Sequence, residues 1–515
     1  MSILLAYISG APDRSDPYLN LLPSGLCYLH AVLREAGHDS RLANVSAWKP
    51  DAIEQFLRAN PPRMAGISQW THNRHQSLKL ARTIRRLAPE CMIVMGGGHA
   101  SFCYADILLD NAVDAVVLGE GEETLLELAD LVSQGLDYRH VAGIAVHGDQ
   151  GPVKTPSRTP RNNLDSLPVP ARYLDTASYG IDRELQAEFI LTARGCPWDC
   201  HFCSSPAFWG RTVRFRSPTA ILDEMLFIRD HFGLIYFSMR DDTFTANRRR
   251  ALDFCRMLAD SGAGLLWNCQ SSVRSLDMEL LTAMKHAGCE CIQLGVESGS
   301  PAVLEKLGKS ITPQQVESVA AMIRAVGIHL SIYLISDLPG ESARDHELTR
   351  SLIRRISPDD GYVSPLAYYP GTEIFHQAVA TGDAPADLFL RSGEQALYAQ
   401  PGRQGATRLL KTFSALPHNI PDFEAQKRLL GFCHTTSIMA GTRYEEDGRN
   451  SKAAAEYQEV CEKMPHSPWG WYLRGELLRR TGNHRESRLC YHRVLELVPH
   501  HGPSRQALGL KKTGP

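Results

Sequence analysis

The sequence lacks any long apolar run and any excess of one charge. No stretch approaches the ~18 consecutive apolar residues that a membrane-spanning helix requires. The 515 residues include 55 basic and 57 acidic ones, which leaves a formal net charge of −2. No general attraction to nucleic acid or to an anionic membrane surface is therefore expected. Residues 1–8 have no basic segment before their apolar run, so they predict a first β-strand of a cytoplasmic protein rather than a secretory signal.

Dense, paired cysteine spacing is also missing. The 13 cysteines are an odd number scattered along a long chain, which is not the pattern of a disulfide framework. A reducing compartment fits this usage best. We expect most of these cysteines, such as Cys255 and Cys291, to be small buried apolar side chains.

Three cysteines depart from that expectation. Cys196, Cys200 and Cys203 follow a CxxxCxxC spacing in a loop opened by Gly195. Thiolates at this spacing can close around one soft metal centre, such as zinc, copper(I) or iron–sulfur iron. A structural zinc ion needs a fourth ligand, such as His201 or a distant residue, whereas a cubic four-iron cluster held by three cysteines leaves one iron open. The spacing alone leaves both possibilities open.

The sequence on either side of the triplet favours an open barrel. Residues 151–185 begin with a stretch rich in Pro, Arg, Asn and Thr and predict a linker. Over residues 186–375, strand and helix patterns repeat six times, and the strand at 188–193 leads directly into the cysteine loop. Six such units predict a partial (β/α)6 barrel, whose chemistry lies at the carboxyl ends of its strands.

The triplet and this barrel pattern resemble the core of the radical S-adenosylmethionine (SAM) superfamily. The segment Gly295-Val296-Glu297-Ser298-Gly299 is the most specific secondary match. The resemblance implies a [4Fe-4S] cluster on the three cysteines, with the open iron chelating the amino and carboxylate groups of SAM. It also implies Phe202 beside the adenine and Glu297 at the ribose or amino group. A helix-capping role next to Ser298 is the alternative for Glu297.

Further candidate SAM contacts are Asp241, Asp242 and Arg274. The two carboxylates follow a predicted strand and could orient SAM or act on substrate, although a cap before the helix at Asn247 explains at least one of them equally well. Family cores usually read Gly-Leu-Pro-Gly-Glu where this chain has Asp337-Leu338-Pro339-Gly340-Glu341. The exchange places a carboxylate near the upper rim of the barrel.

Residues 1–150 predict a second α/β domain. Strand patterns at 64–68, 91–95 and 115–118 are each followed by a helical pattern, which favours a doubly wound parallel sheet. Ligands of such sheets bind at the carboxyl ends of the strands. Glycine clusters at 96–98 and 119–121 fall at two of these ends, where a missing side chain lets a bulky cofactor approach the backbone. The GxGxxG of a dinucleotide fold is absent after the first strand.

The order of these segments resembles the cobalamin-binding, Rossmann-like domain that precedes the radical domain in one large radical SAM class. The resemblance implies that the glycine-rich segments accept the nucleotide tail and that the loop at 69–71 lies under the corrin ring. The implied contact residues are Pro23, Gly25, Gln69, Trp70, Thr71, Gly97, Gly98, His99, Ser101, Gly119, Gly121 and Glu122.

One motif of some cobalamin domains is missing. Domains that ligate cobalt through histidine carry Asp-x-His-x-x-Gly after the first strand, and this chain has no such motif. The resemblance therefore implies cobalamin without a protein imidazole on cobalt. Trp70 is a candidate for covering that face, with ordinary loop packing as the alternative. His99 is expected to order a glycine turn or touch the cofactor tail. A degenerate domain that binds no cobalamin is a further alternative.

The last part of the chain predicts helical repeats. Residues 376–433 are expected to extend the barrel, and residues 434–510 contain a 34-residue self-similarity that aligns Gly441 and Tyr457 with Gly475 and Tyr491. This period resembles two tetratricopeptide repeats. Two repeats are fewer than the ~3 that normally fold alone, so we expect them to pack on the barrel or on a protein partner.

The combined resemblance implies a cobalamin-dependent radical SAM enzyme. The first reaction expected is methylation of an unactivated carbon of a small metabolite, lipid or natural-product intermediate, with electrons from a donor such as flavodoxin or ferredoxin. Oxidative cyclisation or ring rearrangement with the same cofactors is the alternative. A repeat-based scaffold with an inactive core is the alternative of another class. No basic groove or aromatic stacking run indicates nucleic acid.

Overall fold

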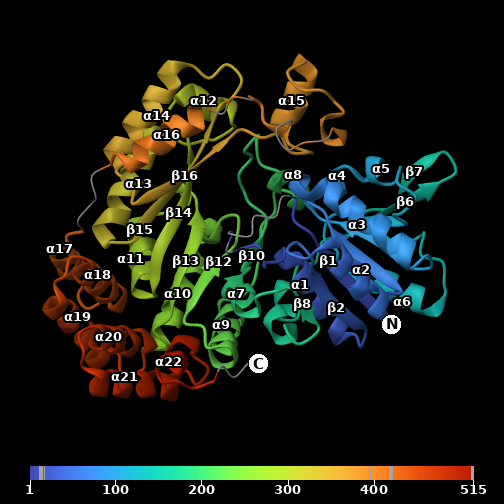
Figure 1. Ribbon diagram of the computed structural model, residues 1–515. Helices are drawn as coiled ribbons and strands as arrows, with labels where there is room; N and C mark the ends of the chain where they lie inside the picture. The colour runs from blue at the N-terminus through green and yellow to red at the C-terminus, as the bar shows by residue number, and fades with distance from the viewer. Residues whose placement is uncertain are drawn as a thin grey trace. The chain divides into compact units, whose positions relative to one another are not determined.

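The computed structural model describes residues 1–10, 16, 18–391, 393, 397–400, 402, 404–416 and 421–511. Contacts divide the chain into two compact units (Figure 1). Unit 1 comprises Met1–Ala187, Trp198–Arg214 and Ala367–Pro401, and unit 2 comprises Glu188–Pro197, Phe215–Leu366 and Gly402–Pro515. The extension expected at 376–433 therefore contributes to both units, apart from the residues in it that lie outside the described ranges. None of the described helices is long and apolar enough to cross a bilayer.

Unit 1 is built on one eight-stranded sheet with the order β7-β6-β5-β4-β3-β1-β2-β8. Its strands are β1 (Ser2–Tyr7), β2 (Asp39–Asn44), β3 (Met64–Ser68), β4 (Met92–Gly96), β5 (Ala115–Val117), β6 (Ile144–Gly148), β7 (Gly151–Lys154) and β8 (Ser178–Tyr179). The strands from β8 to β5 are parallel, whereas β6 and β7 pair antiparallel. The predicted parallel sheet is thus confirmed except at one edge, because the two-residue turn between β6 and β7 permits only a hairpin.

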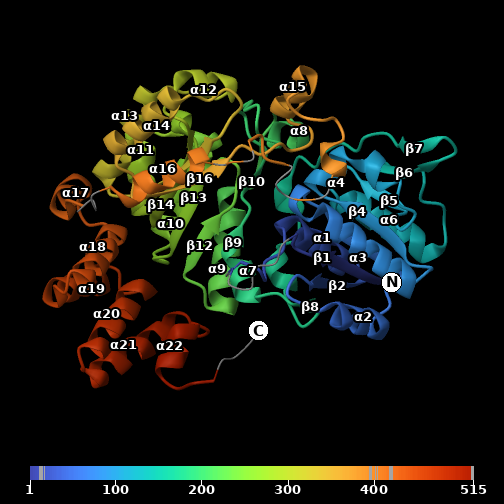
Figure 2. The same ribbon diagram turned by 45° about the horizontal axis from the view of Figure 1, so that its top comes forward.

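The strand order of unit 1 reverses between β1 and β3. Helix α1 (Ser24–Glu35) packs against α6 (Glu122–Gln134), and α2 (Pro50–Ala59) packs against α3 (Arg74–Leu87), as in a doubly wound sheet (Figure 2). In such folds the crevice at the reversal point, at the carboxyl ends of the strands, is the usual ligand site. The loops after β1, β3, β4 and β5 all reach this edge.

The range predicted as a linker, 151–185, is folded into unit 1. It supplies β7, β8 and two 3-10 helices, Leu164–Ser166 and Pro170–Tyr173. The apolar side chains of this range that are buried are Leu164, Leu167, Ala171 and Leu174. These buried residues are not spaced with the period of a helix or a strand. The sequence of this range therefore carried no signal that it packs on the sheet.

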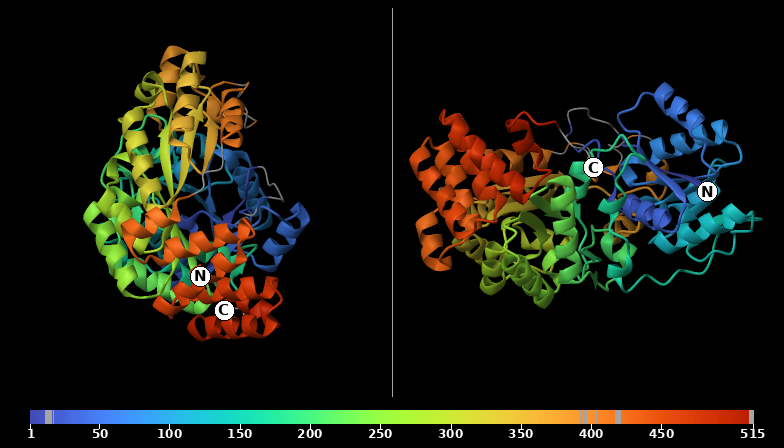
Figure 3. Two further views of the ribbon diagram at one scale, coloured as in Figure 1. Left: turned by 90° about the vertical axis from the view of Figure 1, so that its left-hand side faces the viewer. Right: turned by 90° about the horizontal axis from the view of Figure 1, so that it is seen from below.

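Unit 2 contains a six-stranded sheet in the order β16-β15-β14-β13-β12-β9. Its strands are β9 (Phe189–Ile190), β12 (Tyr236–Met239), β13 (Leu266–Ser271), β14 (Cys289–Glu297), β15 (His329–Ser336) and β16 (Asp360–Pro365), and every neighbouring pair is parallel. This confirms the six predicted βα units, with β9 and β16 at opposite edges of an open barrel. The covering helices are α9 (Pro218–Phe232), α10 (Arg248–Asp260), α11 (Met278–His286), α13 (Pro313–Val326) and α14 (Ala343–Ile356) (Figure 3).

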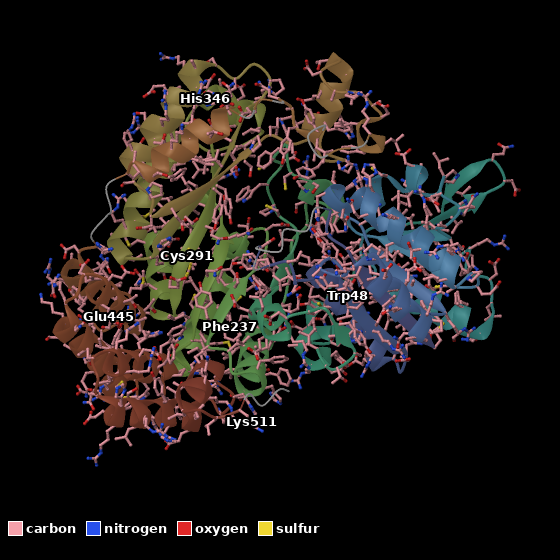
Figure 4. All side chains as sticks on the ribbon, viewed as in Figure 1. Trp48, Phe237, Cys291, His346, Glu445 and Lys511 are labelled. Atoms are coloured by element: carbon pink, nitrogen blue, oxygen red, sulfur yellow. The ribbon has the colours of Figure 1, made fainter. Side chains whose placement is uncertain are left out.

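Aromatic packing fixes the centre of unit 2. The rings of Phe244, Phe254 and Trp267 are fully buried and lie within 5.7 Å of one another, measured between centroids. Phe237 on β12 is also fully buried (Figure 4). Burying such side chains provides a large share of the stabilisation of a fold.

The C-terminal helices close the amino ends of the barrel strands. They are α17 (Phe423–Leu430), α18 (His434–Glu446), α19 (Asn450–Lys463), α20 (Pro468–Arg480), α21 (His484–Leu497) and α22 (Gly502–Ala507). Trp469 Nε1 donates to the carbonyl oxygen of Ile235, just before β12, at 3.0 Å. Close Gly–Tyr packing recurs between helix pairs, with Gly441 against Tyr457 and Gly475 against Tyr491. The helices thus pack on the barrel, while their assignment as tetratricopeptide repeats stays a prediction.

Candidate active site

The cysteine loop presents three accessible thiols. Cys196, Cys200 and Cys203 are all partly exposed, whereas nine of the ten other cysteines are buried. Gly195 opens the loop with φ +96°, a left-handed conformation that favours glycine. Cys196 Sγ lies 3.6 Å from Thr243 Oγ1. The Cys203 thiol accepts from the Ser205 amide at 3.4 Å, which orients the sulfur.

The thiol triplet fits an iron–sulfur cluster better than a zinc ion. Across the described ranges, no three His, Cys, Asp or Glu side chains are placed to hold a single metal ion. Tetrahedral zinc needs four ligands within about 2.0–2.3 Å of one point. A cubic cluster instead carries its irons on separate corners, so its thiol ligands stand further apart. The donor set of three thiols therefore matches a four-iron cluster with one open iron.

Asp241 positions the strand that leads into the cysteine loop. Its carboxylate accepts from the amides of Thr192 at 2.6 Å and Ala193 at 2.9 Å, and from the Thr192 hydroxyl. Burial raises the pKa of Asp241, and the nearby Arg250 guanidinium lowers it. Both carboxylate oxygens of Asp241 thus accept hydrogen bonds from the protein itself. The suggested cap belongs to another residue, because Asn247 itself accepts from the Arg250 amide at the start of α10.

Glu297 is held in a buried ion pair at the carboxyl end of β14. Its Oε1 accepts from Lys309 Nζ at 2.9 Å, and both side chains are largely buried. A Cβ on Gly295 would lie 2.6 Å from that carboxylate oxygen, so glycine makes room for the pair. Glu297 has φ +65°, next to a register shift between β14 and β15. Helix α12 (Pro301–Lys306) is capped by Ser300, which excludes the capping alternative for Glu297.

The other predicted SAM residues lie in different settings. Phe202 is half-buried, and Asp242 and Arg274 are exposed. The loop carrying Phe202 is fixed by the Ile374 amide, which donates to the His201 carbonyl oxygen at 2.9 Å. None of these positions tests a role in SAM binding, which stays a prediction.

Asp337 caps a helix that the sequence did not connect to it. Its carboxylate accepts from the amides of Gly405 at 2.8 Å and Ala406 at 2.9 Å, at the start of α16 (Gln404–Ser414). Asp337 also keeps φ +60°, the conformation that a glycine would adopt freely. The departure from the family pattern thus exchanges a flexible glycine for a helix cap.

Two glycine-rich loops of unit 1 meet at one serine. Ser101 Oγ donates to the Gly97 carbonyl oxygen at 3.0 Å and accepts from the Gly119 amide at 3.0 Å. Gly97 has φ +106°, and a Cβ there would lie 2.8 Å from the Gln69 carbonyl oxygen. Ser101 and Gly97 therefore build the rim, and the open space beside Gly119 is what a bulky ligand needs.

Within the loop after β3, only Trp70 presents its side chain outward. Gln69 and Thr71 are buried, whereas Trp70 is 42% exposed and its ring lies 3.3 Å from where a Cβ of Gly98 would be. Gln69 Nε2 donates to the Arg74 carbonyl oxygen at 3.0 Å, and its buried Oε1 has no hydrogen-bond partner among the described residues. Trp70 thus fits a covering role, and Gln69 and Thr71 a supporting one.

His99 is a neutral, internally bonded histidine. Its Nδ1 lies 3.1 Å from Thr71 Oγ1, and its ring meets the edge of Phe389. Burial lowers the pKa of His99 to about 3, with Arg74, His75 and His72 adding to the effect. His99 thus links the turn after β4 to Thr71, and its predicted role, ordering the glycine turn or touching the cofactor tail, stays a prediction.

The remaining predicted contacts flank the two helices that start at this edge. Pro23 precedes α1, and no atom lies within 4 Å of a Cβ added at Gly25. A Cβ on Gly121 would approach Leu29 at 3.1 Å. Glu122 begins α6 and is buried. Gly25 therefore leaves space, whereas Gly121 serves helix packing.

Two residues at these sites escaped the sequence reasoning. Lys309 follows Glu297 by 12 positions, and only the Gly308-Lys309 turn after α12 could have indicated it. Arg214 pairs with Glu120, inside the Gly119–Gly121 loop, and both side chains are largely buried. Their separation in sequence left no local signal.

The family comparisons agree with this geometry. Residues 16–129 match the B12 binding domain, and residues 190–353 match the Radical SAM superfamily. The fold and the two sites thus define a radical SAM enzyme with a B12-binding domain. An uncharacterized methyltransferase of Pyrococcus horikoshii is 30% identical over 370 residues, which cover 70% of this chain and 78% of that protein. The chain belongs to the family of B12-binding radical SAM proteins.

Other relatives carry different activities in their names. Anaerobic magnesium-protoporphyrin IX monomethyl ester cyclase of Rubrivivax gelatinosus is 27% identical over 70% of this chain and 66% of its own. Cytidylyl-2-hydroxyethylphosphonate methyltransferase of Streptomyces wedmorensis is 26% identical over 78% of this chain and 86% of its own. Among solved structures, the radical SAM methyltransferase TsrM of Kitasatospora setae has a TM-score of 0.67 at 17% identity, covering 87% of this chain and all of that one. This last likeness concerns the fold.

Proposed function

We propose that this chain is a cobalamin-dependent radical SAM methyltransferase that acts on an unactivated carbon of a small molecule. The observation that carries the proposal is the presence, in one chain, of an accessible thiol triplet with the Glu297–Lys309 pair and of a glycine-lined rim whose buried His99 is bonded to Thr71. Two of the relatives are named methyltransferases. When bound, the cluster and SAM supply a 5′-deoxyadenosyl radical, and cobalamin supplies a methyl group.

In this proposal, SAM is held by charge. Cys196, Cys200 and Cys203 would hold the cluster, which would leave one iron open for SAM. The Glu297 carboxylate accepts hydrogen bonds from the SAM ribose or amino group, since a carboxylate offers several acceptor positions. Lys309 keeps that carboxylate oriented. Phe202, Asp242 and Arg274 are the further contacts that the family resemblance implies.

In unit 1, the protein holds cobalamin by shape. The loops at 97–101 and 119–122, together with Pro23 and Gly25, accept the nucleotide tail. Trp70 would cover one face of the corrin and would keep water away from cobalt. The proposal assigns no protein imidazole to cobalt, since the chain lacks Asp-x-His-x-x-Gly after the first strand and His99 Nδ1 lies 3.1 Å from Thr71 Oγ1.

The test counts SAM products after anaerobic reconstitution with iron, sulfide, cobalamin and a reductant. Methyl transfer predicts S-adenosylhomocysteine beside 5′-deoxyadenosine. Cys200→Ala should remove the cluster absorbance and lower SAM cleavage about 1000-fold or more, since a cluster ligand is lost. Cys255→Ala, a buried cysteine outside the loop, is the matched control and should cleave SAM normally. Zinc in place of iron, or full turnover by Cys200→Ala, would end the proposal.

A cyclase is the second candidate, because a magnesium-protoporphyrin cyclase is among the relatives. The same product count separates the two. A cyclase predicts 5′-deoxyadenosine with little S-adenosylhomocysteine. An inactive scaffold predicts no cleavage of SAM at all.

The proposal also includes partners. An electron donor such as flavodoxin or ferredoxin is needed to reduce the cluster. The second is a protein partner at the C-terminal helices, in addition to their packing on the barrel. A pull-down from anaerobic lysate with and without residues 434–510 tests the second of these.

A further inference from the structure

The barrel strands of unit 2 have one apolar face and one polar face. On β14, Ile292, Leu294 and Val296 are fully buried, and the residues between them are partly exposed. Successive side chains of a strand point to opposite faces. Helices α11 and α13 pack on the apolar side, so residues such as Gln293 belong to the inner face. Cys291 marks this strand in Figure 4.

Strand register places five inner-face residues at two neighbouring levels. Gly295 of β14 pairs with Tyr333 of β15, and Tyr333 pairs with Tyr362 of β16. Gln270 pairs with Gln293, and Met239 pairs with Cys269, which puts Arg240 beside Gln270. We call this set the inner belt: Arg240, Gln270, Gln293, Tyr333 and Tyr362. It lies just below Glu297, at the carboxyl end of β14.

The inner belt contains a flat aromatic platform. The rings of Tyr333 and Tyr362 are stacked, with centroids 5.3 Å apart and planes 20° from parallel. Tyr333 OH donates to Gln293 Oε1 at 3.0 Å, which fixes the inner ring. Tyr362 is 57% exposed, so it has surface free for a further ring.

The same belt carries an available cation. The Arg240 guanidinium lies 4.3 Å from the centroid of the Phe189 ring. Within the described part of the chain, neither this guanidinium nor the Gln270 side-chain amide makes a hydrogen bond. No residue of the belt is a carboxylate. Asp360 of β16 lies in the same register row as Gln293, and its carboxylate is bonded to His329 at 3.1 Å. A planar guanidinium with unused donors matches the geometry of a carboxylate or phosphate.

We propose that the inner belt selects the substrate, and that the substrate is a planar, conjugated small molecule bearing a carboxylate or phosphate. The ring stacks on Tyr362, the anionic group pairs with Arg240, and the amides of Gln270 and Gln293 bond its polar edge. The proposal deepens the proposed function by naming a substrate class for the same barrel, and rests on that function only for the reaction that follows binding.

The test measures binding of four probes to the cluster-reconstituted protein by equilibrium dialysis. The probes are 2-naphthoate, 2-naphthyl phosphate, the neutral 2-naphthamide and the non-planar cyclohexanecarboxylate. Either naphthyl anion, or both, should bind about tenfold more tightly than each of the two comparison probes. The tighter of the two anions identifies the group. Equal binding of all four, or no binding, overturns the proposal.

Three substitutions locate the probe. Arg240→Gln should reduce the preference for the anion over 2-naphthamide about tenfold. Arg240→Lys, which keeps the charge but not the planar fork, should reduce it about threefold. Tyr362→Leu should reduce the preference for the planar anion over cyclohexanecarboxylate about fivefold, and Tyr362→Phe should restore it. Arg249→Gln removes the same charge at a position that is 93% exposed and should change nothing. Unchanged preferences in Arg240→Gln overturn the assignment.

A second measurement separates the substrate from SAM. Substrate-free cleavage of SAM by Arg240→Gln should equal that of the wild type. Loss of this cleavage would assign Arg240 to SAM and overturn the proposal. Failure of the wild type to cleave SAM would end the proposed function, yet leave probe binding, which needs no turnover, as the test of the inner belt.

Discussion

The two sheets differ in the residues at their carboxyl edges, and each edge suits a different kind of ligand. In unit 1 the edge is formed by glycine backbone, one serine link and a neutral histidine. In unit 2 it carries buried ionised or ionisable groups, with Glu297 paired to Lys309. A large cofactor needs room and shape, whereas a small zwitterion such as SAM is held by charge. The edge of unit 1 should therefore be sensitive to added atoms, and that of unit 2 to lost charge.

The largest effect should follow from breaking the charge pair of unit 2. Glu297→Gln or Lys309→Met leaves one buried charge without its partner, which costs about 3–5 kcal/mol. The free energy of unfolding in urea should fall by that amount, and SAM affinity in dialysis should fall about tenfold or more.

The double variant Glu297→Gln/Lys309→Met provides the control for this pair. It should recover most of the lost stability, because no unpaired charge remains, but not the SAM affinity. Recovery of both stability and SAM affinity would mean that the Glu297–Lys309 pair serves only the fold. The edge of unit 2 would then not bind its ligand by charge.

A smaller effect should follow from adding one carbon to unit 1. Gly97→Ala combines φ +106° with a Cβ only 2.8 Å from the Gln69 carbonyl oxygen. The free energy of unfolding should fall by about 2–3 kcal/mol. The variant should also lose the absorbance of bound cobalamin that the wild type is expected to show. Gly135→Ala, at φ +70° with open space around it, is the control and should cost about 1 kcal/mol with cobalamin retained. Equal losses in both variants would show that the backbone angle alone matters.

The smallest effect should be a pH dependence at His99. Its pKa in the folded protein is about 3, below the usual 6.5, because burial disfavours the charged form. The neutral side chain therefore contributes fully above pH 6.5, and stability is lost as pH falls from 6.5 towards 3. The slope should reach about 1.4 kcal/mol per pH unit.

The difference between wild type and His99→Gln isolates this slope. Other buried histidines with a lowered pKa, such as His30, contribute equally to both proteins and cancel. The free energy of unfolding should be measured in denaturant at several pH values from 7 to 5. Parallel pH curves for the two proteins would show that His99 is not neutral and buried in solution.

Most of the strand framework was accessible from the sequence. Apolar runs predicted β3, β4 and β5, because buried parallel strands are continuously apolar. The six barrel strands were predicted from their regular alternation with helix patterns. The hairpin of β6 and β7 was missed, since its exposed outer residues lack that signal. The supposed linker was missed because its buried leucines have no regular spacing.

The site was accessible only in part. The three cysteines lie within eight residues, so their spacing can be read from the sequence alone. Asp241 and Asp242 are neighbours with the same chemistry, yet one is buried on Thr192 and the other is exposed, and only the fold distinguishes them. The Glu297–Lys309 pair depends on a register shift near Gly295, and no residue period predicts such a shift. Long-range contacts of this kind require coordinates.

The Asp337 cap also bears on how molecules of this protein avoid one another. Helix α16 lies along β16, where Phe413 packs against Gly361. β16 is the last strand of its sheet, and uncovered edge strands are templates for association between chains. The Asp337 carboxylate, just after β15, caps the helix that shields this edge. Solubility in concentrated solution is thus linked to one aspartate at the carboxyl edge of the barrel.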